Sequence, residues 1–395
     1  MCDHTMDPTG DVIFKLNNPN VPLAIWDDEQ PPVQATGPGP FADTPPAIPI
    51  AEPAISAENA SLASNMPPNQ QDSEATSQED PQLTRLPLEP VTFLISSRHL
   101  ILASPVFKAM LTGGWNEGDK ISGPFQVSAQ DWNAEAVTIV MNVLHNHYGQ
   151  VPKTVTLKML AKIAVIVDYY KIHEAFQAIS QLWIDALRKQ PLPTCLGNDV
   201  TLWILVSWVF EAANTFKYVT KVAVLRSRED VKVPHELPIP SAVIDRINQD
   251  RKDAMDLIAA GIGGLQQDYV EGRAGCDFEC RAMHLGALML SLNNLNFSGH
   301  PSKPHFGNCS LTKVVDILSG MKSPKWCTLG RVSREHQCPP GPPNVEARAF
   351  KLDVGEKTPR NLVIGVLNGY AALLVNGAKD KMEGLLLADF VSSTT

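Results

Sequence analysis

Short apolar runs near the start of the chain predict β-strands. Residues 11–16 are strand-like, and a turn cluster of Asn and Pro follows them at residues 17–20. A second run, rich in β-branched and aromatic side chains, covers residues 91–95, and residues 125–127 predict a third short strand. The free-energy cost of closing a loop rises only with the logarithm of its length. We therefore expect the first two runs to belong to one sheet that a long loop interrupts.

Helical periodicity follows the second strand. Ser104 and Pro105 place an N-cap and a first-turn proline before an apolar stripe, and Gly113-Gly114 ends that helix. Apolar side chains then recur at helical spacing in three more segments. These segments cover residues 136–144, 160–167 and 176–186.

The rest of the chain is mostly helical by the same criterion. Asp199 can cap a helix that runs through Phe216, and Ser241 can cap another. Two further candidate helices cover Cys280–Leu292 and Leu362–Val375. No internal repeat and no coiled-coil heptad pattern is present.

Residues 27–87 differ from their surroundings in composition. They are dense in Pro, Ala, Ser, Asp and Glu, and Arg85 is their only basic residue. Few large apolar side chains are available to offset the entropy of ordering this segment. We predict a disordered acidic insertion. It either carries a short linear motif for a partner or is a tolerated insertion without a role of its own.

Charge and cysteine content narrow the classes of function. The formal net charge is -9 and the pI is near 5.6, which argues against nucleic-acid binding through phosphate contacts. The most apolar run, Leu202–Phe210, is about half the ~20 residues that a membrane helix needs. No signal peptide is visible, and the 7 cysteines are an odd number. We therefore expect an intracellular protein that binds neither nucleic acid nor membranes.

One stretch of the chain resembles a known family. Its pattern is an apolar residue, Ala, Ser, then Phe and Met-Leu at fixed spacing, and it is similar to a helix start in BTB/POZ domains. The residues that carry it are Leu102-Ala103-Ser104-Pro105-Val106-Phe107-Lys108-Ala109-Met110-Leu111. Further similar segments are residues 7–13 for the first strand, and residues 131–136, 160–170 and 174–187 for the later helices.

The resemblance implies an α+β fold, with a small sheet and a helical cluster. The BTB/POZ domain would be discontinuous: residues 8–26 supply its first strands, residues 27–87 are the insertion, and residues 88–190 complete it. The whole chain also resembles BTB-containing proteins of filamentous fungi, in which a helical region rich in Trp follows. This second likeness implies a mainly α-helical domain at residues 191–338, and a Pro-rich linker with a terminal helix at residues 339–395.

The same resemblance implies a protein-interaction module rather than an enzyme. It would act as a scaffold or as a ubiquitin-ligase substrate adaptor, and its partners would be a second copy or a cullin-type scaffold. Trp115 and Glu117 stand where cullin-binding members carry an apolar residue and a Glu, although packing and solvation explain these two residues equally. The chain departs from many BTB domains at Ser96-Ser97 and at Leu144-His145, positions that shape the dimer in the animal family.

A cysteine–histidine set is the best candidate for site chemistry. Cys276, Cys280 and His284 follow at intervals of four and share one helix face, and a second cluster comes later. The alternative to a plain interaction module is a BTB oligomeriser that carries a structural zinc-binding helical domain. Its candidate zinc ligands are Cys276, Cys280, Cys327, His336 and Cys338. Small buried cysteines at helical spacing are also common core residues. No motif of nucleophilic, metallohydrolase or nucleotide chemistry appears, so no catalysis and no cofactor other than this zinc is expected.

Overall fold

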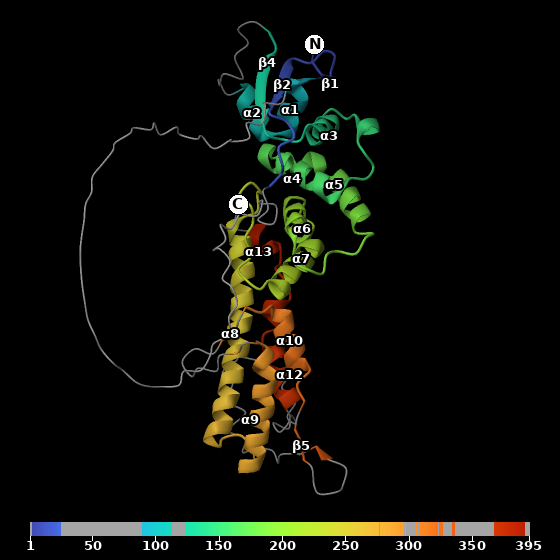
Figure 1. Cartoon of the computed structure of the whole chain (residues 1–395). Helices are drawn as coiled ribbons and strands as arrows, with labels where there is room; N and C mark the ends of the chain where they lie inside the picture. Colours follow the sequence, from blue (N-terminus) through green and yellow to red (C-terminus); the bar gives the residue numbers. More distant parts are fainter. Residues whose placement is uncertain are drawn as a thin grey trace, which may run out of the picture. The chain divides into compact units, whose positions relative to one another are not determined.

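The computed structural model describes residues 2–24, 89–112, 123–275, 277–295, 297, 305–306, 308–322, 324–326, 334–335 and 367–391. The chain divides into two units, residues 1–26 with 88–395, and residues 27–87, and all described residues belong to the first. This unit is mixed α+β and mostly helical, with a small four-stranded sheet (Figure 1). The predicted α+β class is confirmed at this level. The insertion at 27–87 and the Pro-rich linker predicted after residue 339 lie outside the described residues.

The sheet has the strand order β1-β3-β2-β4. The central strand β2 pairs antiparallel with β3 and parallel with β4, and β1 lies parallel to β3 at one edge. The strands are β1 (His4–Thr5), β2 (Val12–Asn17), β3 (Val91–Ile95) and β4 (Phe125–Gln130). A separate pair, β5 (Lys325–Trp326) and β6 (Arg334–Glu335), forms in the second half. The prediction that the two runs around the long loop form one sheet is confirmed.

Alternation along β2 decides which face of the sheet is buried. Val12, Phe14 and Leu16 are fully buried, as expected for a period of two, and they meet Phe93 and Ile95 from β3. Asn18 and Asn20 adopt positive φ angles of 46° and 68°, which end the strand in the predicted turn. The inward face of the sheet is therefore the base on which the following helices pack.

Five helices follow the sheet within residues 97–187. Ser104, Asn133 and Thr156 each accept a hydrogen bond from a backbone N–H three residues on, so side-chain capping starts three of them. The three predicted apolar stripes fall on the last three helices. The helices are α1 (Ser97–Ala103), α2 (Pro105–Thr112), α3 (Ala134–Leu144), α4 (Leu157–Tyr170) and α5 (His173–Leu187), with a 3₁₀ turn η3 (Tyr148–Gln150).

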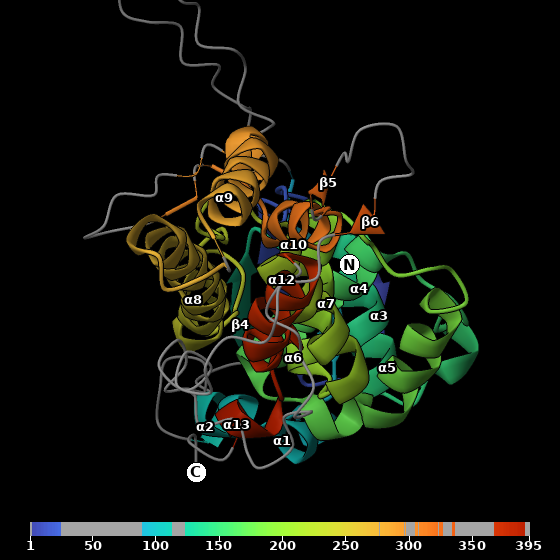
Figure 2. The same cartoon turned by 90° about the horizontal axis from the view of Figure 1, so that it is seen from below.

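The second half of the described chain is also helical. Helices α8, α9, α10 and α12 pack against one another, and α6 and α7 pack together next to α4 (Figure 2). The elements are α6 (Asn198–Val209), α7 (Ala213–Arg226), α8 (Ser241–Glu271), α9 (Phe278–Leu292), η4 (Asn293–Leu295), α10 (Leu311–Ser319), α12 (Leu367–Gly377), η5 (Lys379–Met382) and α13 (Ala388–Val391).

The prediction of one helix from Asp199 through Phe216 is wrong. The chain forms two helices, because Glu211 adopts a left-handed φ of 52° between α6 and α7. Helix α6 begins at Asn198 with Gly197 at its N-cap, so Asp199 lies in the first turn rather than at the cap. The apolar run within α6 is buried on almost all sides. Among the described residues, no helix is long and apolar enough to cross a membrane.

The C-terminal segment returns to the middle of the chain. The Leu385 N–H donates to the buried Thr220 hydroxyl on α7 at 2.9 Å. Phe390 lies edge-on to the rings of Trp208 and Phe216, with centroids 6.5 and 6.4 Å away. Further back, Lys381 contacts Asp250 and Asp253 of α8 at 3.3 and 3.1 Å. These contacts fasten the end of the chain to α6, α7 and α8.

Replacing Gly384 with Ala is expected to destabilise the fold by about 2 kcal/mol or more. Gly384 has a φ of +83°, and an added Cβ would overlap the Lys217 carbonyl oxygen and lie 2.9 Å from the Lys221 nitrogen. Urea unfolding of the full chain measures the effect. Gly149→Ala is the matched control, since a Cβ there meets nothing within 4 Å. Equal unfolding midpoints for the two variants would show that the close approach of Gly384 to α7 does not occur.

Candidate functional site

Helix α1 presents an apolar surface beside the sheet. Leu102 is 88% exposed, whereas Leu100 on the opposite side of the helix is fully buried. Ile101 is half-buried next to it in the chain, Val106 is half-buried on the following helix α2, and Arg98 is exposed one turn earlier. A single exposed Leu is ordinary on a protein surface, but one with half-buried apolar neighbours forms a small contact patch. We call Arg98, Ile101, Leu102 and Val106 the α1 surface.

The two positions at which the chain departs from many BTB domains contact each other. The Ser96 N–H donates to Nε2 of His145 at 3.0 Å, and Nδ1 of His145 lies 2.8 Å from the Met141 carbonyl oxygen. The carbonyl can only accept, so Nδ1 carries the proton and Nε2 accepts from Ser96. Both ring nitrogens are therefore engaged when His145 is neutral. Protonation at Nε2 would break the bond that holds the start of α1 to the end of α3.

The surroundings of His145 favour its neutral form. Burial lowers the pKa of His145, and the nearby His99 and His147 lower it further, whereas the Met141 carbonyl and Asp7 act in the opposite direction. The ring centroids of His99 and His147 lie 4.9 and 6.3 Å from that of His145. Nδ1 of His99 and Nδ1 of His147 are both buried without a hydrogen-bond partner. His145 is thus an acid-sensitive link behind the α1 surface, because its bond to Ser96 requires the neutral ring.

A second polar link positions the first turn of α1. The backbone N–H and the hydroxyl of Ser97 donate to the two carboxylate oxygens of Asp11, at 2.8 and 2.9 Å. Asp11 directly precedes β2, so the carboxylate ties the helix to the central strand. The Ser96 N–H and the N–H and hydroxyl of Ser97 bond internally, whereas the charged side chain of Arg98 is exposed.

The residues that carry the BTB resemblance meet at the start of α2. The Ser104 hydroxyl accepts from the Phe107 N–H at 3.0 Å, which confirms the predicted N-cap, and donates to the Tyr170 carbonyl at 2.6 Å. The rings of Phe107 and Tyr170 stack with centroids 4.0 Å apart, and Trp132 lies edge-on to Tyr170 at 5.2 Å. Burial raises the pKa of Tyr170 far above its usual value. One hydroxyl therefore joins the start of α2 to the end of α4.

The predicted partner residues Trp115 and Glu117 lie outside the described residues. The described chain instead shows an aromatic pair that sequence reasoning missed. Tyr169 is 60% exposed, and its ring centroid lies 5.3 Å from that of the half-buried Trp132 in an edge contact. The available signal was the Tyr169-Tyr170 pair at the end of a helix, where two neighbouring aromatic side chains point about 100° apart around the helix axis.

The cysteine–histidine set is only partly described. Cys280 and His284 are both buried on one face of α9, as their spacing predicted, with Sγ 3.5 Å from Nδ1. Nδ1 of His284 also lies 2.9 Å from the Cys280 carbonyl, and Tyr269 stacks on the imidazole at 5.8 Å. The other four members of the predicted zinc set, Cys276, Cys327, His336 and Cys338, lie outside the described residues.

Metal binding by this set stays a prediction. Among the described residues, no three His, Cys, Asp or Glu side chains gather closely enough to hold a metal ion. The pair of Cys280 and His284 supplies at most half of a tetrahedral zinc site.

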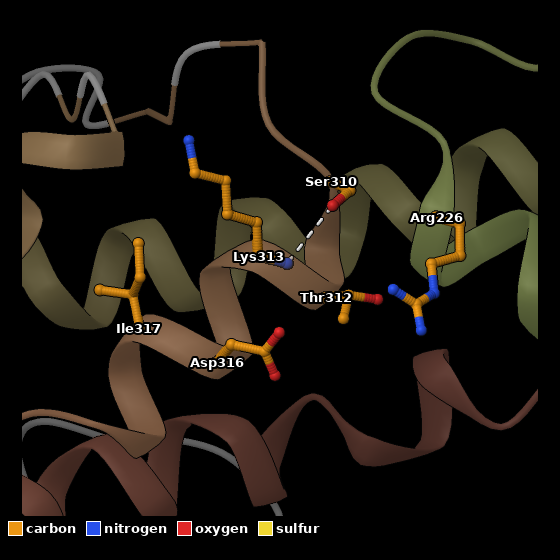
Figure 3. Close-up of a pocket in the computed structure, with 6 residues that line it drawn as sticks. All are labelled: Arg226, Ser310, Thr312, Lys313, Asp316 and Ile317. Atoms are coloured by element: carbon orange, nitrogen blue, oxygen red, sulfur yellow. Dashed lines mark hydrogen bonds between the residues drawn. The ribbon is translucent and has the colours of Figure 1, made fainter. Parts of the chain in front are cut away.

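An open cleft of about 550 Å³ lies where the end of α7 meets the start of α10. Figure 3 shows Arg226 reaching it from α7, while the other lining residues follow one another along α10 and its cap. The Ser310 hydroxyl caps α10 by accepting from the Lys313 N–H, and the Thr312 hydroxyl donates to the Leu225 carbonyl. Both hydroxyls of the cleft therefore serve the backbone and are not poised as nucleophiles.

Comparisons with known protein families and with curated proteins give no match. No model of a known protein family matches the chain, and no curated protein matches its sequence.

Stability is expected to fall as the pH drops below 6.5, the ordinary pKa of His, and His145→Gln should reduce this loss. The pKa of His145 is lowered in the folded state, so between that lowered value and 6.5 the unfolded chain binds more protons. The contribution of neutral His145 to the free energy of unfolding is fully present above pH 6.5. It is lost as the pH falls towards the pKa of His145 in the folded state.

Urea unfolding at pH 7.5 and pH 5.5 measures the difference. His173, whose pKa is also lowered by burial, contributes equally to both proteins and cancels in the comparison. His235→Gln is the control, because that side chain is 93% exposed. The assignment is wrong if His145→Gln loses as much stability on acidification as the wild type does.

Proposed function

We propose that this chain is a protein-interaction module built on a BTB/POZ-type domain, made of residues 8–26 and 88–190. In this proposal the domain associates with a second copy of itself through the α1 surface. The helical second half extends the module or holds a separate partner, and no catalytic step is involved. The chain acts as a scaffold or as a substrate adaptor of a ubiquitin ligase.

The order of the elements supports the proposal. The resemblance implies a first strand, a second strand, a helix start at Ser104, a later helix that ends at Leu144, and two closing helices. The described chain has β2, β3, α1 and α2, α3 and then α4 and α5 in these places. Strand β4, which pairs in parallel with β2, is an additional strand that lies in the chain between α2 and α3. No element of this part is out of the implied order.

Contacts among the residues of the resemblance also support it. The Ser104 hydroxyl bonds to both Phe107 and Tyr170, so residues that share a pattern in sequence also share one structural task. Ala103 and Leu111 of the same string are half-buried and buried. Capping of α2 therefore explains the Ser of the pattern, and packing in the core explains its Phe.

The observation that carries self-association is the exposure of Leu102. Helix α1 carries the almost fully exposed Leu102, with half-buried Ile101 next to it in the chain and half-buried Val106 on α2. An exposed apolar side chain that becomes buried in an interface stabilises it in proportion to the apolar area removed from water. The Ser96 N–H and the N–H and hydroxyl of Ser97 bond inwards, so an apolar partner surface fits better than a charged one. A second α1 surface meets this requirement, with Arg98 at the rim.

Light scattering of the full chain tests the proposal. The wild type is expected to be dimeric at micromolar concentration, and Leu102→Asp is expected to lower its dimer affinity at least tenfold, because a carboxylate would lose its water in the interface. The side chain is 88% exposed, so the monomer should fold normally, which circular dichroism verifies.

Leu182→Asp is the matched control on α5, where Leu182 is 64% exposed. A wild type that is monomeric throughout, or a Leu102→Asp variant as dimeric as Leu182→Asp, would refute association through α1. A pull-down with a cullin-type protein distinguishes an adaptor role from a plain scaffold role. If the chain is an adaptor, the wild type binds the cullin-type protein, and a Trp115→Ala, Glu117→Ala double variant does not.

A structural zinc in the helical half is the second candidate, and the shared buried face of Cys280 and His284 favours it. A bound zinc would give about one ion per chain by elemental analysis, lost on Cys280→Ser. The same zinc content in wild type and variant would remove this candidate.

A further inference from the structure

Helix α9 exposes an apolar row to solvent. Residues spaced by four form a ridge on a helix surface. One such row, Cys280, His284, Leu288 and Leu292, is buried against the rest of the chain. A second row, Phe278, Ala282, Gly286 and Leu290, lies on another side, where Phe278 is 70% and Leu290 79% exposed. Met289, next to this row, is 57% exposed. A helix that is apolar on both sides is usually covered on both.

Gly286 is not explained by the fold of the chain itself. A glycine inside a helix is unfavourable relative to Ala, and it is retained where another backbone approaches closely. A Cβ at Gly286 would meet nothing within 4 Å, so no neighbour among the described residues requires its absence. Gly261 on α8 shows the contrast, because Leu374 of α12 packs directly on it. The missing side chain at Gly286 therefore leaves room for a surface from outside.

We propose that this row of α9 binds the same row of a second copy of the chain, with the two helices antiparallel. The site is separate from the α1 surface and does not depend on the proposed BTB function. We call Phe278, Ala282, Gly286, Met289 and Leu290 the α9 surface.

The row matches itself about a two-fold axis that passes at the level of residue 284. Antiparallel pairing then places Phe278 opposite Leu290 of the second copy, and Ala282 opposite its Gly286. Large side chains meet at the two ends, and the two small residues let the backbones approach in the middle. Interlocking of two rows spaced by four is the commonest way in which helices of globular proteins pack.

Area and charge both favour a second copy as the occupant. A large apolar side chain offers about 150–200 Å² when fully exposed, so the α9 surface offers roughly 500 Å² per copy. Two copies would bury about 1,000 Å², the lower limit for a specific interface, so association should be weak. Glu279 is the charged residue beside the row. In the antiparallel pair it faces Met289, and the two Glu279 side chains lie roughly 15 Å apart along the axis, beyond the screening length in physiological salt.

Analytical ultracentrifugation of the full chain over a range of micromolar concentrations tests the proposal. The Leu102→Asp background removes the α1 surface, so any remaining self-association reports on α9. In this background we expect weak, concentration-dependent dimers, and at least tenfold weaker association after Gly286→Gln. Gln is a better helix former than Gly and fits the free monomer, so the variant should melt no lower than its parent.

Gly264→Gln is the matched control, since it is an exposed helical glycine on α8 whose Cβ would also meet nothing within 4 Å. It should leave self-association unchanged. Leu290→Glu should weaken association as Gly286→Gln does. The proposal is overturned if the Leu102→Asp chain is monomeric at every concentration, or if Gly286→Gln associates as strongly as Gly264→Gln. Failure of the α1 proposal would give a different result. Leu102→Asp would then leave self-association unchanged, whereas Gly286→Gln and Leu290→Glu would still weaken it.

Discussion

The antiparallel pairing of β2 with β3 is the constraint on which the other described elements of the first half depend. The two strands lie on either side of residues 18–90, so their pairing closes a long loop at a length-dependent cost of about 4 kcal/mol. Burial of Val12, Phe14, Leu16, Phe93 and Ile95 contributes roughly 10 kcal/mol in return. The pairing therefore tolerates the interruption. It also sets the register in which β4 joins β2, and it places Asp11 where its carboxylate fixes the first turn of α1.

The α1 surface follows from how polar groups near the sheet are satisfied. Ser96 and Ser97 direct their hydrogen bonds to His145 and Asp11, so these groups are used inside the protein and not at its surface. Leu102 is left to face solvent on the outer side of the same helix. The bond from Ser96 requires the buried His145 to stay neutral, which couples the position of α1 to pH.

In the second half, glycines mark the closest approaches. Gly261 accepts Leu374 of α12, and Gly384 allows the C-terminal segment to lie against the backbone of α7. The long helix α8 is further held by Lys381, which reaches the buried carboxylate of Asp250. Gly286 has no such neighbour among the described residues, and it lies in the same row of α9 as the exposed Phe278 and Leu290.

The sequence by itself determined the features that depend on neighbouring residues. Strand alternation at Val12, Phe14 and Leu16, the cap at Ser104 and the shared helix face of Cys280 and His284 all follow from local spacing, and the structure has them. Local spacing did not reveal the break at Glu211, because its left-handed backbone is set by the packing of α6 on α7. The contact between Ser96 and His145, and the choice of which apolar side of α9 is buried, were decided only by tertiary structure. Both depend on residues far apart in sequence, and a helix with two apolar sides carries no local signal for which one faces the core.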